Sequence, residues 1–280
     1  MTIFRFLYSV SARYNDPESH RLRINSHVRY LLRWTYMNNN PSQIIVIGGS
    51  GAIGQAMVNE LLRRFPLAHV HATYFQSAFN VDLEEHRERL HLHPLDIRDP
   101  DQVMSFSNQF DQVDWIINCA GYLHGDQGGP EKSIKAIDAD FLIENIKINT
   151  LPTLLLAKHF AAALKKSPAP KFATISARVG SIEDNRLGGW YSYRISKAAL
   201  NMALKTLSIE WKHSHSKGCV AALHPGTNDT PLSKPFQANV APQNLFDPAY
   251  TASKFVELLS QLGSTQSGKF WAWDGTEIPW

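Results

Sequence analysis

Cysteine and long apolar runs are scarce in this chain. Cys119 and Cys219 are the only cysteines among 280 residues, and they lack the spacing of metal ligands. Such scarcity is typical of a reducing compartment and excludes a disulfide-rich scaffold. No apolar run approaches the roughly 18 residues that cross a bilayer. We therefore expect a cytoplasmic protein without a metal site or membrane contact.

A basic surface is also lacking over most of the chain. The formal net charge is +3, but residues 1–36 hold six arginines and two acids. The remaining residues carry 22 basic and 23 acidic side chains, which gives a net charge of −1. A nearly neutral body excludes nucleic-acid binding through a basic face.

Twelve histidines are present, and four of them form two alternating pairs, His69/His71 and His91/His93. Alternate residues share one face of a strand. Zinc sites combine histidine with cysteine or acids, which do not cluster near these pairs. We therefore interpret the four histidines as surface residues rather than zinc ligands.

Residues 1–41 differ in composition from the rest. They are rich in arginine, poor in acids, and end in the turn-like sequence Met37-Asn-Asn-Asn-Pro41. Two interpretations remain open: a targeting or membrane-surface arm, or an N-terminal extension outside the core with Met37 as the natural start. We favour the second, because no cleavage site is evident. Residues 42–280 have the length of one α/β domain.

A glycine-rich turn follows the first apolar run. Residues 43–47 are β-branched and uncharged, and Gly48-Gly-Ser-Gly-Ala-Ile-Gly54 leads into an apolar-periodic stretch that ends before Pro66. This pattern predicts strand, turn and helix. Glycines let the backbone approach a pyrophosphate at a helix N-terminus. The turn fits the dinucleotide-binding fingerprint, although such turns also serve packing alone.

Tyr193 and Lys197 are four residues apart in an apolar-periodic segment. On a helix they share one face. A nearby ammonium lowers the pKa of a phenol from its usual value of about 10, toward the range that suits general acid/base catalysis. The same spacing occurs by chance on surface helices. A catalytic interpretation of the pair therefore depends on the other motifs in the chain.

Five motifs occur in a characteristic order: the glycine turn, Asn118-Cys-Ala-Gly121, Asn149, the Tyr193/Lys197 pair, and Pro225-Gly226. With them the chain resembles the short-chain dehydrogenase/reductase family over roughly residues 42–280. Residues 176–182, 188–193 and 273–280 look like the C-factor and sniffer-like carbonyl reductase branch. The resemblance implies a single Rossmann-type, doubly wound parallel sheet of about seven strands with helices on both faces. It also implies a homodimer or homotetramer.

The resemblance assigns chemical roles to three of these residues. It implies that Tyr193 is the general acid/base, that Lys197 also bonds the nicotinamide ribose, and that Asn149 supports a water in a proton relay. Pro152 removes a backbone donor from a helix expected over about residues 140–166, so we expect a kink near Asn149. A solvent-facing asparagine before an irregular turn is the alternative.

The resemblance also implies a nicotinamide dinucleotide site. Asp96 matches the acid that accepts a hydrogen bond from the adenine amino group, although an acid here could equally cap the next helix. Residues 72–77 offer neither an acid nor a base for the ribose 2′ position, and without an acid a 2′-phosphate is not repelled, so we expect NADP(H) rather than NAD(H). The expected cofactor contacts are Gly48, Ser50, Gly51, Ile53, Gly54, Asp96, Ile97, Asn118, Ala120, Gly121, Tyr193, Lys197, Pro225, Gly226 and Thr230.

The hydroxyl that assists the tyrosine departs from the family pattern. In the family sequence Ile-Ser-Ser the second serine donates to the substrate oxygen, and here that position is Ala177. We assign the catalytic role to Ser176, because it lies at the carboxyl end of a predicted strand, where open α/β sheets bind ligands. Ser181 is the alternative, twelve residues before Tyr193.

These expectations converge on an NAD(P)-dependent oxidoreductase that transfers hydride between nicotinamide and a small carbonyl or alcohol substrate. The alternative is a cofactor-binding regulatory or signalling protein of the C-factor type with weak or no catalysis. The intact Tyr193 and Lys197 favour the enzyme. His224 has no task in this scheme and is interpreted as a structural histidine at a strand end.

Overall fold

The computed structural model describes residues 40–77, 79, 86–126 and 128–280. Pro41–Trp280 form one compact unit. The N-terminal segment lies almost entirely outside the described residues, so its interpretation stays a prediction. Among the described residues, no helix is long and apolar enough to cross a membrane.

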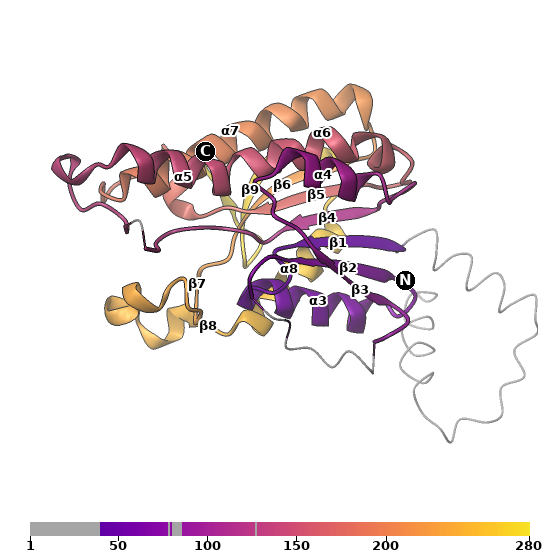
Figure 1. The fold of residues 1–280 in the computed structure, drawn as a ribbon, viewed down its shortest axis with the longest axis horizontal. Coiled ribbons are helices and arrows are strands. Elements are labelled where there is room, and N and C mark those ends of the chain that lie inside the picture. The colour runs from indigo at the N-terminus through magenta and orange to yellow at the C-terminus, as the bar shows by residue number, and fades with distance from the viewer. Residues whose placement is uncertain (1–39, 78, 80–85, 127) are drawn as a thin grey trace, which may run out of the picture. The chain divides into compact units, whose positions relative to one another are not determined.

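An eight-stranded sheet forms the centre of the described chain, in the order β10-β9-β6-β5-β4-β1-β2-β3 (Figure 1). All neighbouring strands are parallel except β9 and β10. The predicted α/β doubly wound sheet is thus confirmed, with eight strands where about seven were expected. The strands are β1 (Gln43–Ile47), β2 (His69–Tyr74), β3 (Leu90–Pro94), β4 (Trp115–Asn118), β5 (Lys171–Ile175), β6 (Cys219–His224), β9 (Lys269–Ala272) and β10 (Glu277–Ile278).

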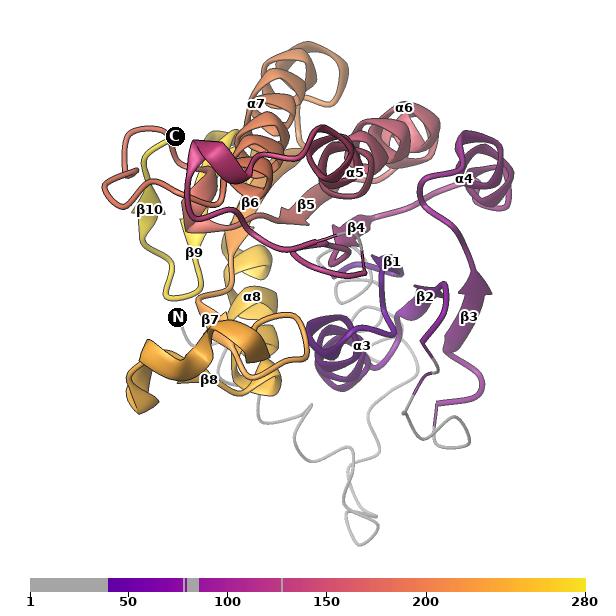
Figure 2. The ribbon, with the colours of Figure 1, turned by 60° about the vertical axis from the view of Figure 1, so that its left-hand side comes forward.

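Helices cover both faces of this sheet (Figures 1 and 2). Helices α3 and α8 lie on one face, and α4, α5, α6 and α7 lie on the other. Two separate clusters of buried apolar side chains fill the space on either side, as strands buried on both faces require. The helices are α3 (Ala52–Arg64), α4 (Pro100–Ser107), α5 (Ala139–Asn149), α6 (Leu151–Lys165), α7 (Tyr191–Ser214) and α8 (Pro248–Gln261).

Two short strands and several 3₁₀ helices occur in the segments that connect these helices and strands. Strands β7 (Thr227–Asn228) and β8 (Leu245–Phe246) form a separate two-stranded parallel pair. Single turns of 3₁₀ helix occur at Ile134–Ala136, Arg178–Gly180, Lys234–Asn239, Pro242–Asn244 and Ser264–Gln266.

The strand order reverses direction at the centre of the sheet. Strand β1 pairs with β2 on one side and with β4 on the other, so the chain winds outward in both directions. Because these strands are parallel, their carboxyl ends lie along one edge of the sheet. In open α/β sheets, ligands bind at that edge, where the winding reverses.

The expected kink near Asn149 is a complete break. Helix α5 ends at Asn149 and α6 begins at Leu151, with Thr150 between them at φ −111°. Pro152 occupies the first turn of α6, where a missing N–H costs nothing. The Thr150 hydroxyl donates to the Ser196 carbonyl oxygen at 2.8 Å, which anchors the break against α7.

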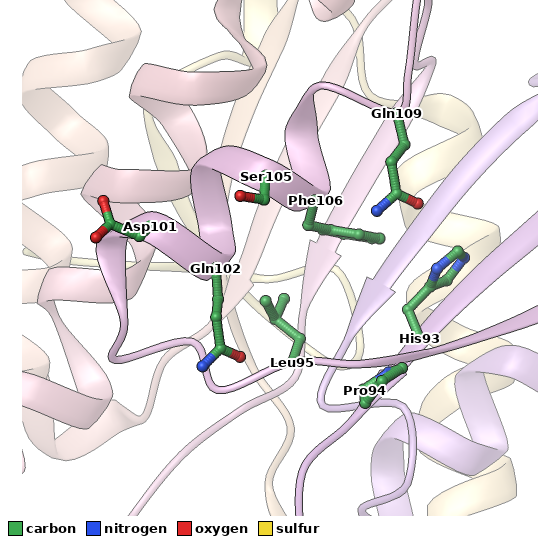
Figure 3. A pocket seen from close by; sticks show the side chains of 8 residues that line it. All are labelled: His93, Pro94, Leu95, Asp101, Gln102, Ser105, Phe106 and Gln109. Atoms are coloured by element: carbon green, nitrogen blue, oxygen red, sulfur yellow. The ribbon is translucent and has the colours of Figure 1, made fainter.

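A hollow of about 360 Å³ lies between the end of β3 and helix α4 (Figure 3). None of the predicted catalytic or cofactor-binding residues lines it. Its lining residues are His93, Pro94, Leu95, Asp101, Gln102, Ser105, Phe106 and Gln109. The predicted site lies instead around the carboxyl ends of β1, β4, β5 and β6.

Candidate active site

The glycine turn between β1 and α3 is closely packed. Gly48 has φ +68°, a conformation that favours glycine, and a Cβ at Gly54 would lie 2.1 Å from the Gly48 carbonyl oxygen. The Gly48 N–H donates to the Thr73 hydroxyl at 3.0 Å. Helix α3 begins with no side-chain cap and no acid in its first turn. Its N-terminal amides therefore suit a pyrophosphate, as the predicted dinucleotide site requires.

The loop after β4 runs beside this turn. A Cβ on Gly48 would lie 3.0 Å from the Ala120 nitrogen, which shows how closely the two backbones approach. The Asn118 side chain accepts from the Ala120 N–H at 3.0 Å and donates to the Thr153 hydroxyl at 3.1 Å. Asn118 thus fixes its own turn, and the small residues after it leave the backbone close to the glycine turn.

Gly121 lies between the glycine turn and the residues predicted to be catalytic. A Cβ there would lie 3.6 Å from the Lys197 Nζ and 3.7 Å from the Asn149 Oδ1. The structure therefore brings the loop after β4, Asn149 and Lys197 together beside the glycine turn, and their roles stay predictions.

Tyr193 and Lys197 lie one turn apart on α7 and are both buried. Their exposed fractions are 8% and 2%, and the Lys197 Nζ lies 5.7 Å from the centre of the Tyr193 ring. The same ammonium donates to the Ile175 carbonyl oxygen at the end of β5, at 3.0 Å. The structure thus brings the pair to one face of the helix, beside the edge of the sheet.

Burial dominates the ionisation of this pair. It raises the pKa of the Tyr193 phenol above its usual value and lowers the pKa of the Lys197 ammonium to about 7. The expected lowering of the tyrosine pKa by Lys197 is therefore wrong for the chain by itself, because burial disfavours the charged phenolate. The neutral phenol is the form that donates a proton to a carbonyl oxygen.

Asn149 is buried, not solvent-facing, with an exposed fraction of 2%. Its side chain accepts from the Tyr122 N–H and donates to the Tyr122 carbonyl oxygen, both at 2.8 Å. The Asn149 amide also lies 3.0 Å from the Ser196 hydroxyl on α7. One asparagine at the helix break therefore connects the loop after β4 with the helix that carries Tyr193.

The two candidate serines make other contacts. The Ser176 hydroxyl donates to the Asn201 side chain at 2.6 Å, one turn beyond Lys197 on α7. The Ser181 hydroxyl accepts from the Asp184 N–H at 3.0 Å. The bond to Asn201 does not favour Ser176 as the catalytic hydroxyl, and its assignment stays a prediction.

Asp96 does not cap the helix that follows it. Asp99 is the cap of α4, where it accepts from the Asp101 and Gln102 N–H groups. Asp96 instead forms a two-pronged ion pair with Arg98, whose shortest contact is 2.7 Å, and these hydrogen bonds lower the pKa of the Asp96 carboxyl. Ile97, which lies between Asp96 and Arg98 in the sequence, packs against one of the two clusters of buried apolar side chains.

Residues 224–230 follow β6 at the same edge of the sheet. Gly226 has φ +70°, and a Cβ there would lie 2.5 Å from the Phe246 ring. Thr230 begins a turn in which its hydroxyl lies 3.3 Å from that of Ser233. The His224 Nδ1 accepts from the Arg178 N–H at 3.2 Å, and burial lowers the pKa of His224 to about 4. These contacts support its interpretation as a structural histidine.

Sequence reasoning missed two residues that shape the site. Thr73, near the carboxyl end of β2, accepts a hydrogen bond from the Gly48 N–H. Glu131, in the irregular segment between β4 and α5, is buried against the start of α7. Neither residue lies in a motif or a periodic segment, so no signal in the sequence marks these long-range contacts.

The sequence profile of the short chain dehydrogenase family matches residues 42–241. This chain belongs to that family, and its enzymes are oxidoreductases. The chain is 33% identical over 171 residues to 1-hydroxy-2-glutathionyl-2-methyl-3-butene dehydrogenase of Rhodococcus sp. (strain AD45), covering 60% of this chain and 69% of that protein. It is 30% identical over 169 residues to C-signal of Myxococcus xanthus, covering 60% of this chain and 93% of that protein.

Solved structures of two carbonyl reductases have the same fold. The carbonyl reductase Sniffer of D. melanogaster superposes with a TM-score of 0.72 at 25% identity, over 86% of this chain and 100% of that one. An NADPH-bound carbonyl reductase from chicken fatty liver gives a TM-score of 0.72 at 25% identity, over 85% and 98%. The chain is thus an oxidoreductase of the short-chain family with carbonyl reductases among its structural neighbours.

Proposed function

We propose that this protein is an NADP(H)-dependent carbonyl reductase in which Tyr193 gives the proton to the substrate oxygen. One observation carries the proposal: the buried Lys197, one turn from Tyr193 on α7, lies beside Gly121, in the loop that packs against the glycine turn. A dinucleotide bound at α3 would therefore extend toward this pair.

The residues of the site divide the chemistry between them. Bound NADPH would supply the hydride to the carbonyl carbon. The neutral Tyr193 phenol donates its proton to the oxygen as negative charge develops there. Burial lowers the pKa of Lys197 to about 7, so this side chain can gain or lose a proton near neutral pH, one helical turn from Tyr193. Asn149 holds the Tyr122 backbone in place beside this pair.

The residues after β2 support NADP(H) as the cofactor. Phe75, Gln76 and Ser77 carry no acid that would repel a 2′-phosphate. The Arg98 guanidinium lies 5.1 Å from the centre of the Phe75 ring, but it is paired with Asp96 and Glu144, so the support for NADP(H) comes from the missing acid alone. We expect kcat/KM to be higher with NADPH than with NADH, and a clear preference for NADH would contradict this choice.

Isotope transfer tests the reaction itself. Full-length protein is incubated with NADPH carrying deuterium at C4 of the nicotinamide, together with a panel of aldehydes and ketones. We expect deuterium on the carbinol carbon of the product, measured by mass spectrometry. NADPH binding without consumption across the panel would contradict the proposal.

The regulatory alternative has two observations in its favour. The chain matches 93% of the length of C-signal, and Ala177 occupies the family position of the catalytic serine. This alternative predicts that NADPH binds and is not consumed, with the same behaviour in a Tyr193→Phe variant.

A homodimer or homotetramer is also part of the proposal. Helices α5 and α7 pack side by side and expose the large apolar side chains Ile143, Met202 and Ile209. Exposed apolar patches of this kind are typical of association surfaces. Light scattering coupled to size-exclusion chromatography tests this, and a monomer at high micromolar concentration would contradict it.

A further inference from the structure

Helix α7, which carries Tyr193, has an unusual start. Gly188, Gly189 and Trp190 adopt left-handed conformations in succession, with φ of +63°, +64° and 55°. Trp190 is the cap residue, and its side chain makes no capping hydrogen bond. A helix N-terminus leaves its first backbone N–H groups without partners inside the helix. The helix must therefore be capped by another part of the chain.

Glu131 provides this cap from the segment between β4 and α5. Its exposed fraction is 5%, and its carboxylate accepts from the Ser192 N–H at 3.1 Å and from the Ser192 hydroxyl. Its backbone carbonyl accepts from the Trp190 N–H at 2.5 Å. Two residues at the start of α7 are thus bound by one residue that lies 61 positions before Ser192.

The N-terminus of α7 itself stabilises the negative charge of the Glu131 carboxylate. Among the residues that the structure describes, no lysine or arginine forms an ion pair with Glu131. A carboxylate at a helix N-terminus is stabilised by the unpaired N–H groups and by the positive end of the helix dipole. Burial strengthens this interaction, because water no longer screens it.

This contact lies next to the reacting group. Ser192 directly precedes Tyr193, and the Trp190 ring packs edge-on against the Tyr193 ring with centroids 6.2 Å apart. Trp190 also contacts Phe236, with centroids 5.0 Å apart. The segment that contains Glu131 begins at the loop held by Asn149. Asn149 also donates to the Ser196 hydroxyl, so α7 is held by Glu131 at Ser192 before Tyr193 and by Asn149 at Ser196 after it.

We propose that Glu131 is a positioning residue for catalysis: its buried carboxylate fixes the first turn of α7 and so sets the place of the Tyr193 phenol. This role rests on the proposed reductase function. It predicts that the loss of the carboxylate lowers kcat more than it changes the KM for NADPH, because the glycine turn is left intact.

The kinetic test compares Glu131→Gln, Glu131→Ala and Ser192→Ala with wild-type protein. Glutamine can still accept from the Ser192 N–H but lacks the charge, so we expect kcat in the order wild type, E131Q, E131A, with a loss of about tenfold or more for E131A. The KM for NADPH should stay within about twofold. Glu210→Gln, an exposed acid on the same helix, is the control and should leave kcat unchanged.

Hydrogen–deuterium exchange provides a measurement that needs no activity. In E131A we expect faster amide exchange in residues 190–197 and unchanged exchange in residues 205–214, in the protein without cofactor. If E131A does not fold, the same exchange measurement is made on E131Q, whose side chain keeps the shape of glutamate. Wild-type kcat in folded E131A, equal losses in kcat and NADPH affinity, or unchanged exchange would each overturn the role of Glu131. An inactive wild-type protein whose E131A variant still exchanges faster would overturn the reductase function and leave the cap established.

Discussion

The Lys197 ammonium donates a hydrogen bond to the Ile175 carbonyl oxygen at 3.0 Å, at the carboxyl end of β5. This bond ties the face of α7 that carries Tyr193 to the central sheet. Because Lys197 is almost fully buried, its ammonium depends on such protein oxygens for solvation. The position of the Tyr193/Lys197 pair is therefore set by the sheet edge at which the glycine turn also lies.

Gly54 tests the packing of the glycine turn. A Cβ at Gly54 would lie 2.1 Å from the Gly48 carbonyl oxygen, whereas one at Gly51 would lie at an ordinary 3.4 Å from the same atom. We expect Gly54→Ala to lower the free energy of unfolding by about 1–3 kcal/mol, as overpacking does. Gly51→Ala should change it by less than about 0.5 kcal/mol. Urea denaturation without cofactor measures both, and equal effects would contradict this packing.

The parts of the fold that sequence predicted are those with local signals. The strand, turn and helix over residues 43–64 follow from a β-branched run, glycines and helical periodicity. The break at Thr150 follows from Pro152 in the middle of a helical pattern. Chain order and resemblance then placed Tyr193, Lys197 and Asn149 in one site, which the structure brings together.

Ser176 tests the assignment of the catalytic hydroxyl. The Ser176 hydroxyl bonds Asn201 on α7, but if Ser176 is the catalytic hydroxyl, Ser176→Ala should still lower turnover sharply. Loss of a main oxyanion donor costs about a hundredfold or more. Turnover of Ser176→Ala and Ser181→Ala with one reducible carbonyl decides between the two serines. A loss of less than about tenfold in Ser176→Ala would reject its catalytic assignment.

The contacts that sequence did not predict are all long-range. Glu131 and Ser192 are 61 residues apart, and Ser176 and Asn201 are 25 apart. Neither pair has a local pattern, because a hydrogen bond between distant segments leaves no periodicity in either. The pKa of Tyr193 was mispredicted for a similar reason: spacing shows that a lysine is near, but not how deeply both groups are buried.

His71 makes the stability of the sheet dependent on pH. The four histidines of β2 and β3 are half-buried rather than fully exposed, and the His71 Nδ1 lies 3.1 Å from the His93 Nε2. Burial, with smaller contributions from His91, His93 and His69, lowers the pKa of His71 from 6.5 to about 3. Between these values the unfolded chain binds more protons, so stability falls as the pH falls.

We expect His71 to account for about 1–2 kcal/mol of the stability lost between pH 7.5 and pH 5, since one pKa unit corresponds to about 1.4 kcal/mol. His71→Leu should reduce that loss, and the exposed His213→Gln should not. Urea denaturation of the three proteins at both pH values measures it. An unchanged pH dependence in His71→Leu would refute this role.

The central claim is that Tyr193 supplies the proton to the substrate oxygen in the proposed reduction. Its most direct test is Tyr193→Phe, which keeps the ring that packs against Trp190 and removes the hydroxyl. NADPH binding is measured by fluorescence titration, and NADPH consumption is measured with the best carbonyl substrate. We expect the dissociation constant to stay within about threefold and turnover to fall at least about a hundredfold, as general acid catalysis typically contributes. Turnover that survives in the variant would contradict the account.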